Sequence, residues 1–412
     1  MPIVSFMVNN LRWIAGGFLL TFFSSFGQTY FISLSAGEIR AEYGLSHGDF
    51  GAVYMLATLA SAASLPLVGK IIDRTSVSAT VALSAPVLAL ACVIMAWSHS
   101  LALLVLSIYL LRLFGQGMFT HIAMTAMGRW FAAQRGRAVS LSAIGVNFGE
   151  AAFPISFVTV AAFLGWRGAW LLAAGILLAV ALPLIYQLMK VERTPQSVAQ
   201  DPNSPAARDW TRAEVLRDPL FWTACLGVLA PAFIGTTVFF HQVYLSELRG
   251  WDASVFAASF AIMSAMTIIF ALVAGQLIDR FSAIRILPSF LAPLALSCFV
   301  LASTDAAWGA YAFMALMGIS YGFSSTLFGA LWPELYGVKH LGGIRSLIVA
   351  FMVFATAMGP GLTGALIDRG VSYPQQITAM GFYCVIMLGL MTLVSRKALK
   401  RAAAHGTRAE PG

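Results

Sequence analysis

The sequence predicts an all-α membrane protein with twelve transmembrane helices in two pseudo-symmetric six-helix halves. Three observations predict this fold. Of the 412 residues, 59% are hydrophobic and 10% are charged; apolar stretches long enough to cross a bilayer recur along the chain; and one short motif occurs twice. Soluble globular proteins contain about 25% charged residues, so a chain this poor in charge is expected to be solvated by lipid.

The apolar stretches supply the helices, because roughly 20 apolar residues cross a ~30 Å hydrocarbon core. Twelve such windows occur, near 11–34, 49–71, 79–97, 101–127, 138–164, 167–189, 219–245, 255–278, 285–303, 306–332, 343–368 and 374–395. The first window lacks a small-residue cleavage site, so we expect a retained helix and not a removed signal peptide. The four cysteines lie singly in four windows, which favours packing roles; the sequence indicates no metal site and no cofactor.

The distribution of lysine and arginine predicts the orientation. If the N-terminus is cytosolic, 20 of the 25 basic residues fall in cytosolic segments, four fall outside and Arg112 lies within a window. Short cytosolic loops retain positive charge. We therefore expect a multi-pass protein of the plasma membrane, such as a bacterial inner membrane, with both termini cytosolic. The net charge of +8 then reflects topology and not nucleic-acid binding.

A six-residue motif divides the chain into halves. Gly-x-x-x-Asp-Arg stands at 69–74 and again, 206 residues later, at 275–280, each time at the cytosolic end of an apolar window. The same offset relates Pro154 to Pro360. One offset shared by several helices is typical of internally duplicated membrane proteins. We predict an N-terminal six-helix bundle at 1–189 and a C-terminal six-helix bundle with a cytosolic tail at 219–412.

The polar segment 190–218 is the expected cytosolic linker between these bundles. It closes with Thr211-Arg212-Ala213-Glu214, a capping-box pattern. We therefore predict a short amphipathic helix on the cytosolic face before Pro219. A passive tether is the favoured role of the segment, and regulation is the alternative.

The two repeated loops resemble the loop signature of the major facilitator superfamily, and the resemblance extends over essentially the whole chain. It implies the major facilitator fold and a gating role for the loops, where glycine lets two helices approach closely and the Asp-Arg pair meets charges and helix ends. Anchoring to lipid headgroups is the alternative, which explains the arginines but not the repeated aspartates. The residues concerned, with the helix-breaking proline of the eleventh window, are Gly69, Asp73, Arg74, Gly275, Asp279, Arg280 and Pro360.

A finer similarity is to the monocarboxylate porters and the oxalate/formate antiporters. The stretch 129–138, Arg-Trp-Phe-Ala-Ala-Gln-Arg-Gly-Arg-Ala, resembles their pattern between helices 4 and 5, and 332–337, Trp-Pro-Glu-Leu-Tyr-Gly, adds to it in the second half. Those families typically carry an arginine in helix 8, and some carry a lysine in helix 1 or 11, to hold the substrate carboxylate. Helix 8 of this chain, 255–278, has no charge, so the branch alone does not imply a carboxylate substrate.

Two ionisable residues lie deep in the predicted bilayer. Arg112 is about twelve positions into helix 4 and Glu150 about thirteen into helix 5, roughly 17–20 Å from the interface where each helix begins. Such charges usually pair or line an aqueous cavity. Arg112 either attracts an anionic substrate or locks helices 4 and 5 through an ion pair. Glu150, with Asn147 one turn earlier, either couples proton movement to transport or neutralises Arg112.

Uncharged polar residues on helices 1, 4, 7 and 10 are candidates for orienting a small polar ligand. Interhelical packing is the alternative for each of them. They are Gln28, Tyr30, Gln116, Thr237, His241, Tyr321 and Ser325. Because the 206-residue offset places Gly318 opposite Arg112 and Thr356 opposite Glu150, we expect the charged site to belong to the N-terminal half alone.

The hypothesis that follows is a secondary carrier for a small organic anion, a carboxylate in particular, coupled to protons and working as a monomer by alternating access. The alternatives are an efflux carrier for amphipathic compounds and a non-transporting membrane sensor. The sequence contains no nucleotide-binding loop, metal-ligand cluster or nucleophile-base constellation, so we do not expect an enzyme. The expected partners are the small anion, protons and the lipid bilayer.

Overall fold

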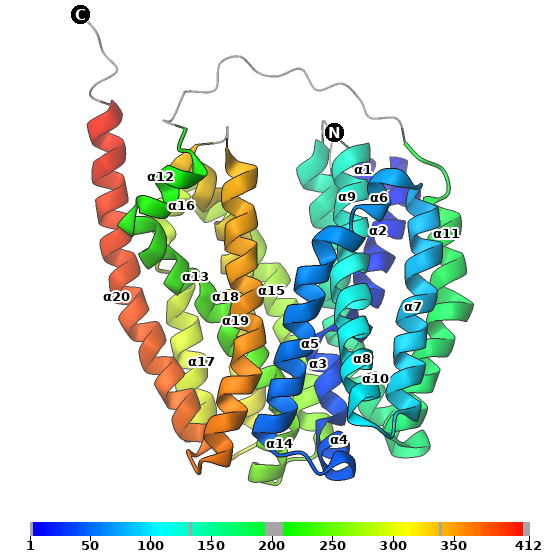
Figure 1. Cartoon of the computed structure of the whole chain (residues 1–412). Coiled ribbons are helices and arrows are strands. Elements are labelled where there is room, and N and C mark those ends of the chain that lie inside the picture. Colours follow the sequence, from blue (N-terminus) through cyan, green and yellow to red (C-terminus); the bar gives the residue numbers. More distant parts are fainter. Residues whose placement is uncertain (1–2, 132–133, 194–208, 338–339, 407–412) are drawn as a thin grey trace, which may run out of the picture. The chain divides into compact units, whose positions relative to one another are not determined.

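The computed structural model describes residues 3–131, 134–193, 209–337 and 340–406. Over these residues the chain consists of helices joined by short turns, without a β-strand (Figure 1). Most of the predicted linker, 194–208, lies outside the described residues, whereas the capping box expected at Thr211 and Glu214 is present and begins a short helix.

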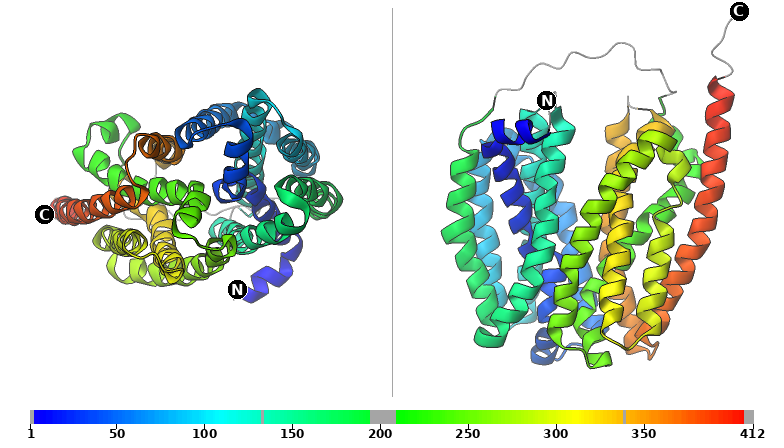
Figure 2. Two further views of the ribbon diagram at one scale, coloured as in Figure 1. Left: turned by 90° about the horizontal axis from the view of Figure 1, so that it is seen from below. Right: turned by 180° about the vertical axis from the view of Figure 1, so that it is seen from behind.

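The predicted N-terminal bundle, 1–189, contains the elements α1 to α11, and α1 lies across the end of the neighbouring helices (Figure 2). Their bounds are α1 Ile3–Asn9, α2 Leu11–Phe23, η1 Ser24–Gly27, α3 Thr29–Ile32, η2 Ser33–Ser35, α4 Ala36–Tyr43, α5 His47–Val68, α6 Ile71–Arg74, α7 Val77–Trp97, α8 Leu101–Leu110, η3 Leu111–Phe119, α9 Thr120–Trp130, α10 Arg135–Ile176, η5 Leu177–Ala181 and α11 Leu182–Met189.

The remaining elements follow the linker. Their bounds are α12 Arg212–Arg217, α13 Pro219–Phe240, α14 Gln242–Arg249, α15 Ala253–Phe281, α16 Ala283–Ile286, α17 Leu291–Ser303, α18 Trp308–Tyr336, α19 Leu341–Asp368 and α20 Tyr373–Gly406.

Ten helical stretches among the described residues are long and apolar enough to cross a membrane. One of them, Gly136–Met189, has 54 residues and turns at Gly165, whose φ of +69° favours glycine. It therefore contains two of the predicted spans. The first predicted span is not among the ten because it is divided into short helices, and with it the twelve expected spans are accounted for.

The first span departs from the expected continuous helix. After α2, the chain forms a 3₁₀ turn over Ser24–Gly27, and Gln28 is extended, with φ of −82° and ψ of 152°. The expectation of an uninterrupted helix over 11–34 is therefore wrong. Serine competes for backbone hydrogen bonds, as Ser24 does by donating to Thr21 O at 2.6 Å, and glycine weakens a helix further. The break leaves backbone carbonyls without helical partners.

Helix 4 also changes its winding within the predicted span. The α-helix α8 passes into a π-helix, η3, and returns to α-helix in α9. Short π-helical stretches occur frequently at functional sites because the extra residue per turn moves side chains out of their α-helical register. Arg112, the deep arginine of the sequence prediction, is the second residue of η3.

The helices group into two compact units. The first contains Met1–Gln200, Phe239–Ala261 and Pro360–Asp368, and the second contains Asp201–Val238, Ile262–Gly359 and Arg369–Gly412. Two segments from the second half of the sequence thus pack within the unit that contains the N-terminal helices.

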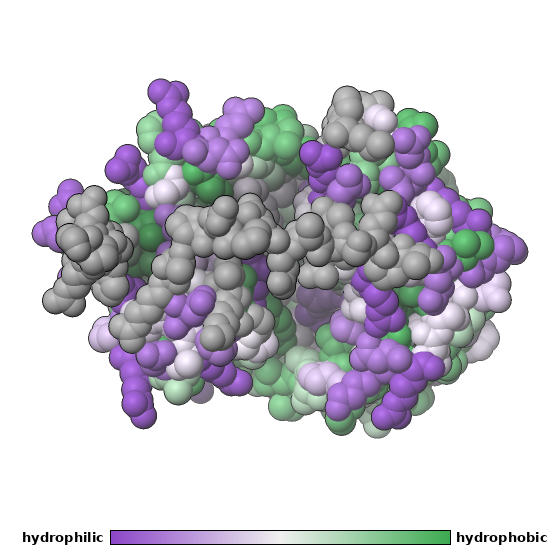
Figure 3. All heavy atoms as spheres, turned by 90° about the horizontal axis from the view of Figure 1, so that it is seen from above, coloured by the Kyte–Doolittle hydropathy of each residue, from purple (hydrophilic) through white to green (hydrophobic). Residues whose placement is uncertain are grey.

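Hydrophilic residues gather on the face seen in Figure 3, with apolar residues at its edges. In the first unit this face carries α6, where Lys70, Asp73 and Arg74 are exposed. It is the face that the sequence prediction assigns to the cytosol.

Candidate functional site

Arg112 is held against the break in the first span. Its side chain is only 4% exposed. Nη1 donates to Gly27 O at 3.2 Å and lies 3.4 Å from Thr29 Oγ1, to which it also donates. Within the described part of the chain, the buried Nε has no hydrogen-bond partner. The break leaves Gly27 O without a hydrogen bond inside the helix, and this carbonyl oxygen accepts the hydrogen bond from the guanidinium.

An aromatic ring completes the surroundings of the arginine. The guanidinium carbon of Arg112 lies 5.4 Å from the centroid of the Tyr54 ring, within the range of a cation–π contact. The Tyr54 hydroxyl lies 2.6 Å from Thr29 Oγ1, and both residues are buried. Tyr54 and Thr29 thus orient each other around the positive charge, but neither supplies a negative charge to balance it.

Two glycines allow this arrangement. A Cβ atom at Gly115 would lie 2.6 Å from Gly27 Cα and 2.7 Å from Gly27 N, closer than carbon atoms pack. A Cβ at Gly27 would meet the backbone of η3 at Leu111 and Gln116. The break in the first span and the π-helix therefore touch backbone to backbone, and this contact places Gly27 O within reach of Arg112.

Glu150 lies in α10 and does not pair with Arg112. The described residues contain no ion pair between these two side chains, so of the two alternatives the helix-locking ion pair is not the one seen in this structure. The neighbouring Gly149 packs directly against Ser25 of the broken span, and Tyr30 lies close enough to Glu150 to interact with its charge. Glu150 is partly exposed, and it stands on a different helix than the arginine does.

Three buried polar atoms lie beside the break, namely Ser25 Oγ, Tyr30 Oη and Arg112 Nε. Arg112 Nε has no hydrogen-bond partner among the described residues, whereas the Ser25 and Tyr30 hydroxyls interact with each other. Buried polar groups are normally hydrogen-bonded, and an unsatisfied one costs about 1–3 kcal/mol. One unit thus holds a guanidinium donor, two hydroxyls and a carboxylate around an interrupted helix, a donor set that suits a small polar ligand.

The other predicted N-terminal residues lie near these groups. Gln28 is the extended residue of the break, and Gln116 follows Arg112 by four positions in η3. Asn147 precedes Glu150 by one turn. All three side chains are partly exposed and make no side-chain hydrogen bond within the residues that the structure describes.

The predicted ligand residues of helices 7 and 10 belong to the second unit, with the exception of His241. Thr237 Oγ1 donates to Phe233 O at 2.7 Å, and Ser325 Oγ donates to Gly322 O at 2.9 Å. The Tyr321 hydroxyl donates to Pro231 O at 3.3 Å. Thr237 and Ser325 therefore bond to the backbone of their own helices, whereas Tyr321 bonds across to α13, as the interhelical-packing alternative expects.

His241 lies where the segment Pro360–Asp368 packs on α5. Its Nε2 lies 3.3 Å from Pro360 O. A Cβ at Gly51 would lie 2.9 Å from the Pro360 carbonyl carbon, so glycine allows the two backbones to touch. Asp368 accepts hydrogen bonds from His47 N at 3.2 Å and from the next amide at 2.8 Å, and thereby caps the N-terminus of α5.

The two repeated loops differ in their contacts. In the first, Asp73 forms an ion pair of 2.8 Å with Arg129, and a Cβ at Gly69 would lie 3.1 Å from His121 Nε2. In the second, a Cβ at Gly275 would meet no atom of the described residues within 4 Å. In this structure Gly69 thus has a close neighbour and Gly275 has none among the described residues, and the gating role of the two loops stays a prediction. The exposed Asp279 has no ion-pair partner among the described residues.

Sequence reasoning missed several residues that build the site. Gly27, Thr29, Tyr54 and Gly115 were not singled out, although they determine what Arg112 contacts. The two glycines carried a signal, since glycine within an apolar span often marks a close backbone approach. Tyr54 and Thr29 carried none, because each contacts the arginine through tertiary packing.

The sequence was compared with models of known protein families, and one family matches most of the chain. The model of the Major Facilitator Superfamily matches residues 17–360. The chain belongs to the major facilitator superfamily. Members of this superfamily are membrane transporters and not enzymes, so the protein is a multi-pass membrane transporter with the major facilitator fold.

Relatives in sequence agree with this assignment. The chain is 23% identical over 335 residues to the uncharacterized MFS-type transporter YhjX of Escherichia coli strain K12, a match that covers 80% of this chain and 82% of that protein. It is 26% identical over 369 residues to human monocarboxylate transporter 11, covering 84% of this chain and 74% of that one. The resemblance to the monocarboxylate branch is thus confirmed as a distant one.

Solved structures show the same fold. A bacterial homolog of the human lysosomal transporter Spinster, in an inward-facing and occupied conformation, matches with a TM-score of 0.73 and 17% identity over 97% of this chain and 98% of that one. The nucleoside transporter NupG matches with a TM-score of 0.63 and 15% identity over 94% and 99% of the two chains. At these identities the likeness concerns the fold alone.

Proposed function

We propose that this transporter carries a small organic anion, a carboxylate in particular, and that Arg112 binds its negative charge. The observation that carries the proposal is the buried guanidinium, which has a carbonyl, a hydroxyl and an aromatic ring around it but no carboxylate partner among the described residues. An unpaired charge in a bilayer costs several kcal/mol. A bound anion would supply the missing negative charge, and the buried Nε would donate to it.

The distant relationship to monocarboxylate transporter 11 supports a carboxylate as the anion. A planar carboxylate can accept two parallel hydrogen bonds from one guanidinium. Nη1 of Arg112 is engaged with Gly27 and Thr29, so we infer that the anion binds on the Nε side. Gln28 belongs to the break and Gln116 to the same π-helix as Arg112, and their partly exposed amides suit the polar remainder of a small acid.

Proton coupling is assigned to Glu150. It is partly exposed, lies beside Tyr30 and has no ion pair in the described part of the chain. A carboxylate that is not held by an arginine can bind and release a proton during the cycle. Because it stands on a different helix from Arg112, proton binding and anion binding can be coupled without direct contact between the two side chains.

For the transport cycle we propose alternating access by movement of the halves 1–189 and 219–412, joined by the linker 190–218, in a monomer with both termini cytosolic. Such rocking of two repeats is the usual mode of duplicated carriers. A bacterial inner membrane is the proposed location. The loop residues Asp73 and Arg129 would hold the first half together on its cytosolic side.

Counterflow in proteoliposomes tests the proposal. Purified protein is reconstituted, loaded with one unlabelled acid from a panel of mono- and dicarboxylates, and assayed for uptake of the same labelled acid. We expect exchange of at least one carboxylate, its loss in Arg112→Gln, and normal exchange in Arg285→Gln, which removes an exposed arginine from α16.

Two results would contradict the proposal. If folded wild-type protein exchanges none of the acids, the anion-carrier function is wrong. If Arg112→Gln exchanges the accepted acid at the wild-type rate, the carrier function stands but the assigned site is wrong. Uptake of amphipathic cations that is insensitive to this substitution would instead favour the efflux alternative.

A further inference from the structure

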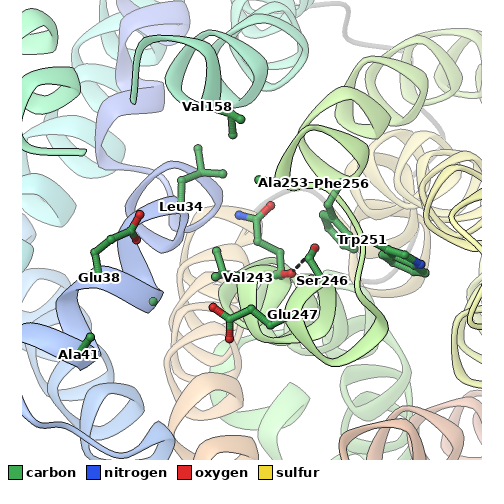
Figure 4. A pocket seen from close by; sticks show the side chains of 12 residues that line it. Leu34, Glu38, Ala41, Val158, Val243, Ser246, Glu247, Trp251, Ala253 and Phe256 are labelled. Atoms are coloured by element: carbon green, nitrogen blue, oxygen red, sulfur yellow. Dashed lines mark hydrogen bonds between the residues drawn. The ribbon is translucent and has the colours of Figure 1, made fainter. Parts of the chain in front are cut away.

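The first unit contains a cavity of about 470 Å³ that the proposed anion site does not use. Residues of α4, α10, α14 and α15 line it (Figure 4). Leu34, Val158 and Phe256 give it apolar walls, and no described residue that lines it is a lysine, arginine or histidine. Its volume is typical of a small-molecule site.

Two carboxylates line this cavity from different helices. Glu38 belongs to α4 and Glu247 to α14, and they stand on opposite sides of the cavity (Figure 4). Both are exposed. Arg40 is a neighbouring cation, whose Nη2 lies 4.0 Å from Glu247 Oε2 and whose Nη1 lies 2.6 Å from His47 Nε2. Glu38 has no ion pair within the described part of the chain.

The two carboxylates influence each other. Although Glu38 remains accessible to solvent, partial desolvation by the surrounding protein and, less strongly, the negative charge of Glu247 raise its pKa, while a hydrogen bond to its own backbone amide acts in the opposite direction. Two acids that share a space without an adequate counter-ion repel each other, and a cation bound between them relieves that repulsion.

A buried amide provides a second, independent indication. Gln242 lines the cavity and is 2% exposed. Its Nε2 donates to Tyr30 O and to Ser33 Oγ, each at 2.8 Å, which fixes the orientation of the amide. Its Oε1 is consequently a buried acceptor without a donor among the described residues. Ser246, which also lines the cavity, donates its hydroxyl to Gln242 O at 2.9 Å, so its lone pairs can accept.

The aromatic side of the cavity also favours positive charge. Trp251 and Phe256 line it together (Figure 4). The Trp251 ring already receives a cation, since the guanidinium carbon of Arg249 lies 5.2 Å from its centroid. Aromatic faces beside carboxylates are the usual surroundings of bound ammonium groups.

We propose that this cavity is a second ligand site, which binds an ammonium group attached to an apolar body. Glu38 and Glu247 hold the charge, Gln242 Oε1 accepts a hydrogen bond from the ligand, and the apolar wall covers its body. The ligand has the opposite charge to the proposed anion, so this site stands whether or not Arg112 carries the transported substrate. A free organic cation and a lipid with an ammonium headgroup share this chemistry.

Equilibrium dialysis of labelled benzylammonium, whose N–H groups can donate to Gln242 Oε1, against full-length protein in dodecyl maltoside tests the site. We expect saturable binding of one cation per chain. The double variant Glu38→Gln, Glu247→Gln should bind at least about tenfold more weakly, since each exposed charge pair contributes a few-fold. Asp252→Asn is the matched control, because it removes an exposed acid outside the cavity and asparagine still caps the following helix.

Several outcomes decide the matter. No saturable binding to monodisperse wild-type protein, or equal affinity in the double variant, would overturn the proposal. An equal loss in Asp252→Asn would overturn it too, because general surface charge would then explain the binding. Competition by added phosphatidylethanolamine but not by phosphatidylglycerol supports the site and assigns it to a lipid headgroup; no competition by either supports a free cation.

Discussion

The backbone contact between Gly27 and Gly115 offers a sharp test of how the arginine is positioned. In Gly115→Ala the new Cβ would lie 2.6 Å from Gly27 Cα, whereas ordinary contacts begin near 3.4 Å. The break in the first span must therefore move away by nearly 1 Å. The hydrogen bond from Arg112 Nη1 to Gly27 O, now 3.2 Å long, would then exceed its useful length.

The magnitude follows from the two losses. Overpacking of this kind costs about 1–3 kcal/mol, and the loss of one hydrogen bond to a charged donor costs about 1.5–3 kcal/mol. We expect Gly115→Ala to remain folded with a lowered melting temperature and to transport with a KM raised by at least about tenfold. The assay is counterflow of the accepted acid in proteoliposomes, with thermal unfolding of the same preparation.

A matched control lies two residues away in the same π-helix. A Cβ at Gly117 would meet Leu65 Cδ1, a flexible side-chain methyl, at 3.3 Å. Gly117→Ala should therefore transport like the wild type. If Gly115→Ala also transports like the wild type, or if both variants lose transport equally, the backbone contact does not position Arg112 and the account of the site is wrong.

Three further predictions concern other parts of the first unit. Glu150→Gln should exchange the acid but fail to accumulate it against a gradient when a pH difference is imposed; accumulation at the wild-type level would exclude Glu150 from proton coupling. Gly51→Ala adds a methyl group 2.9 Å from the carbonyl carbon of Pro360 and should loosen the packing of the segment Pro360–Asp368 on α5. A Ser33→Cys reporter should then be labelled faster by an impermeant thiol reagent. Background labelling is low because the four native cysteines are buried, and an unchanged labelling rate would refute the prediction. Arg167 lowers the pKa of Glu42 through their hydrogen bond. At pH 7 the wild type should therefore be more stable than Glu42→Gln by about 0.2–1 kcal/mol, the contribution of an exposed ion pair, and should melt at a higher temperature. That difference should disappear as the pH falls below the usual glutamate range of about 4.3 through the lowered pKa, and a pH-independent difference would contradict it.

Much of the fold could be predicted because it depends on properties that short windows carry. Apolar length gives the spans, and a shared offset gives the repeat. The deep positions of Arg112 and Glu150 followed from counting residues along helices, and the structure places Arg112 beside the break in the first span.

The rest could not be predicted because tertiary contacts decide it. A break at Ser24–Gly27 leaves the Gly27 carbonyl without a hydrogen bond inside the helix. The group that donates to this carbonyl is Arg112, which is 85 residues away in η3. The π-helix and the separation of Arg112 from Glu150 depend on how helices rotate about their axes. Equal loop motifs do not ensure equal surroundings: Gly69 packs against His121, whereas a Cβ at Gly275 would contact none of the residues that the structure describes.

Direct binding tests the central claim, that Arg112 holds the substrate anion. Equilibrium binding of the accepted labelled carboxylate to purified wild type, Arg112→Gln and Arg285→Gln would be measured in detergent without a membrane gradient. Saturable binding to wild type and Arg285→Gln, with an affinity lowered by about 10–150-fold in Arg112→Gln as expected for the loss of a charged hydrogen bond, is the predicted result. An unchanged dissociation constant in folded Arg112→Gln would contradict it.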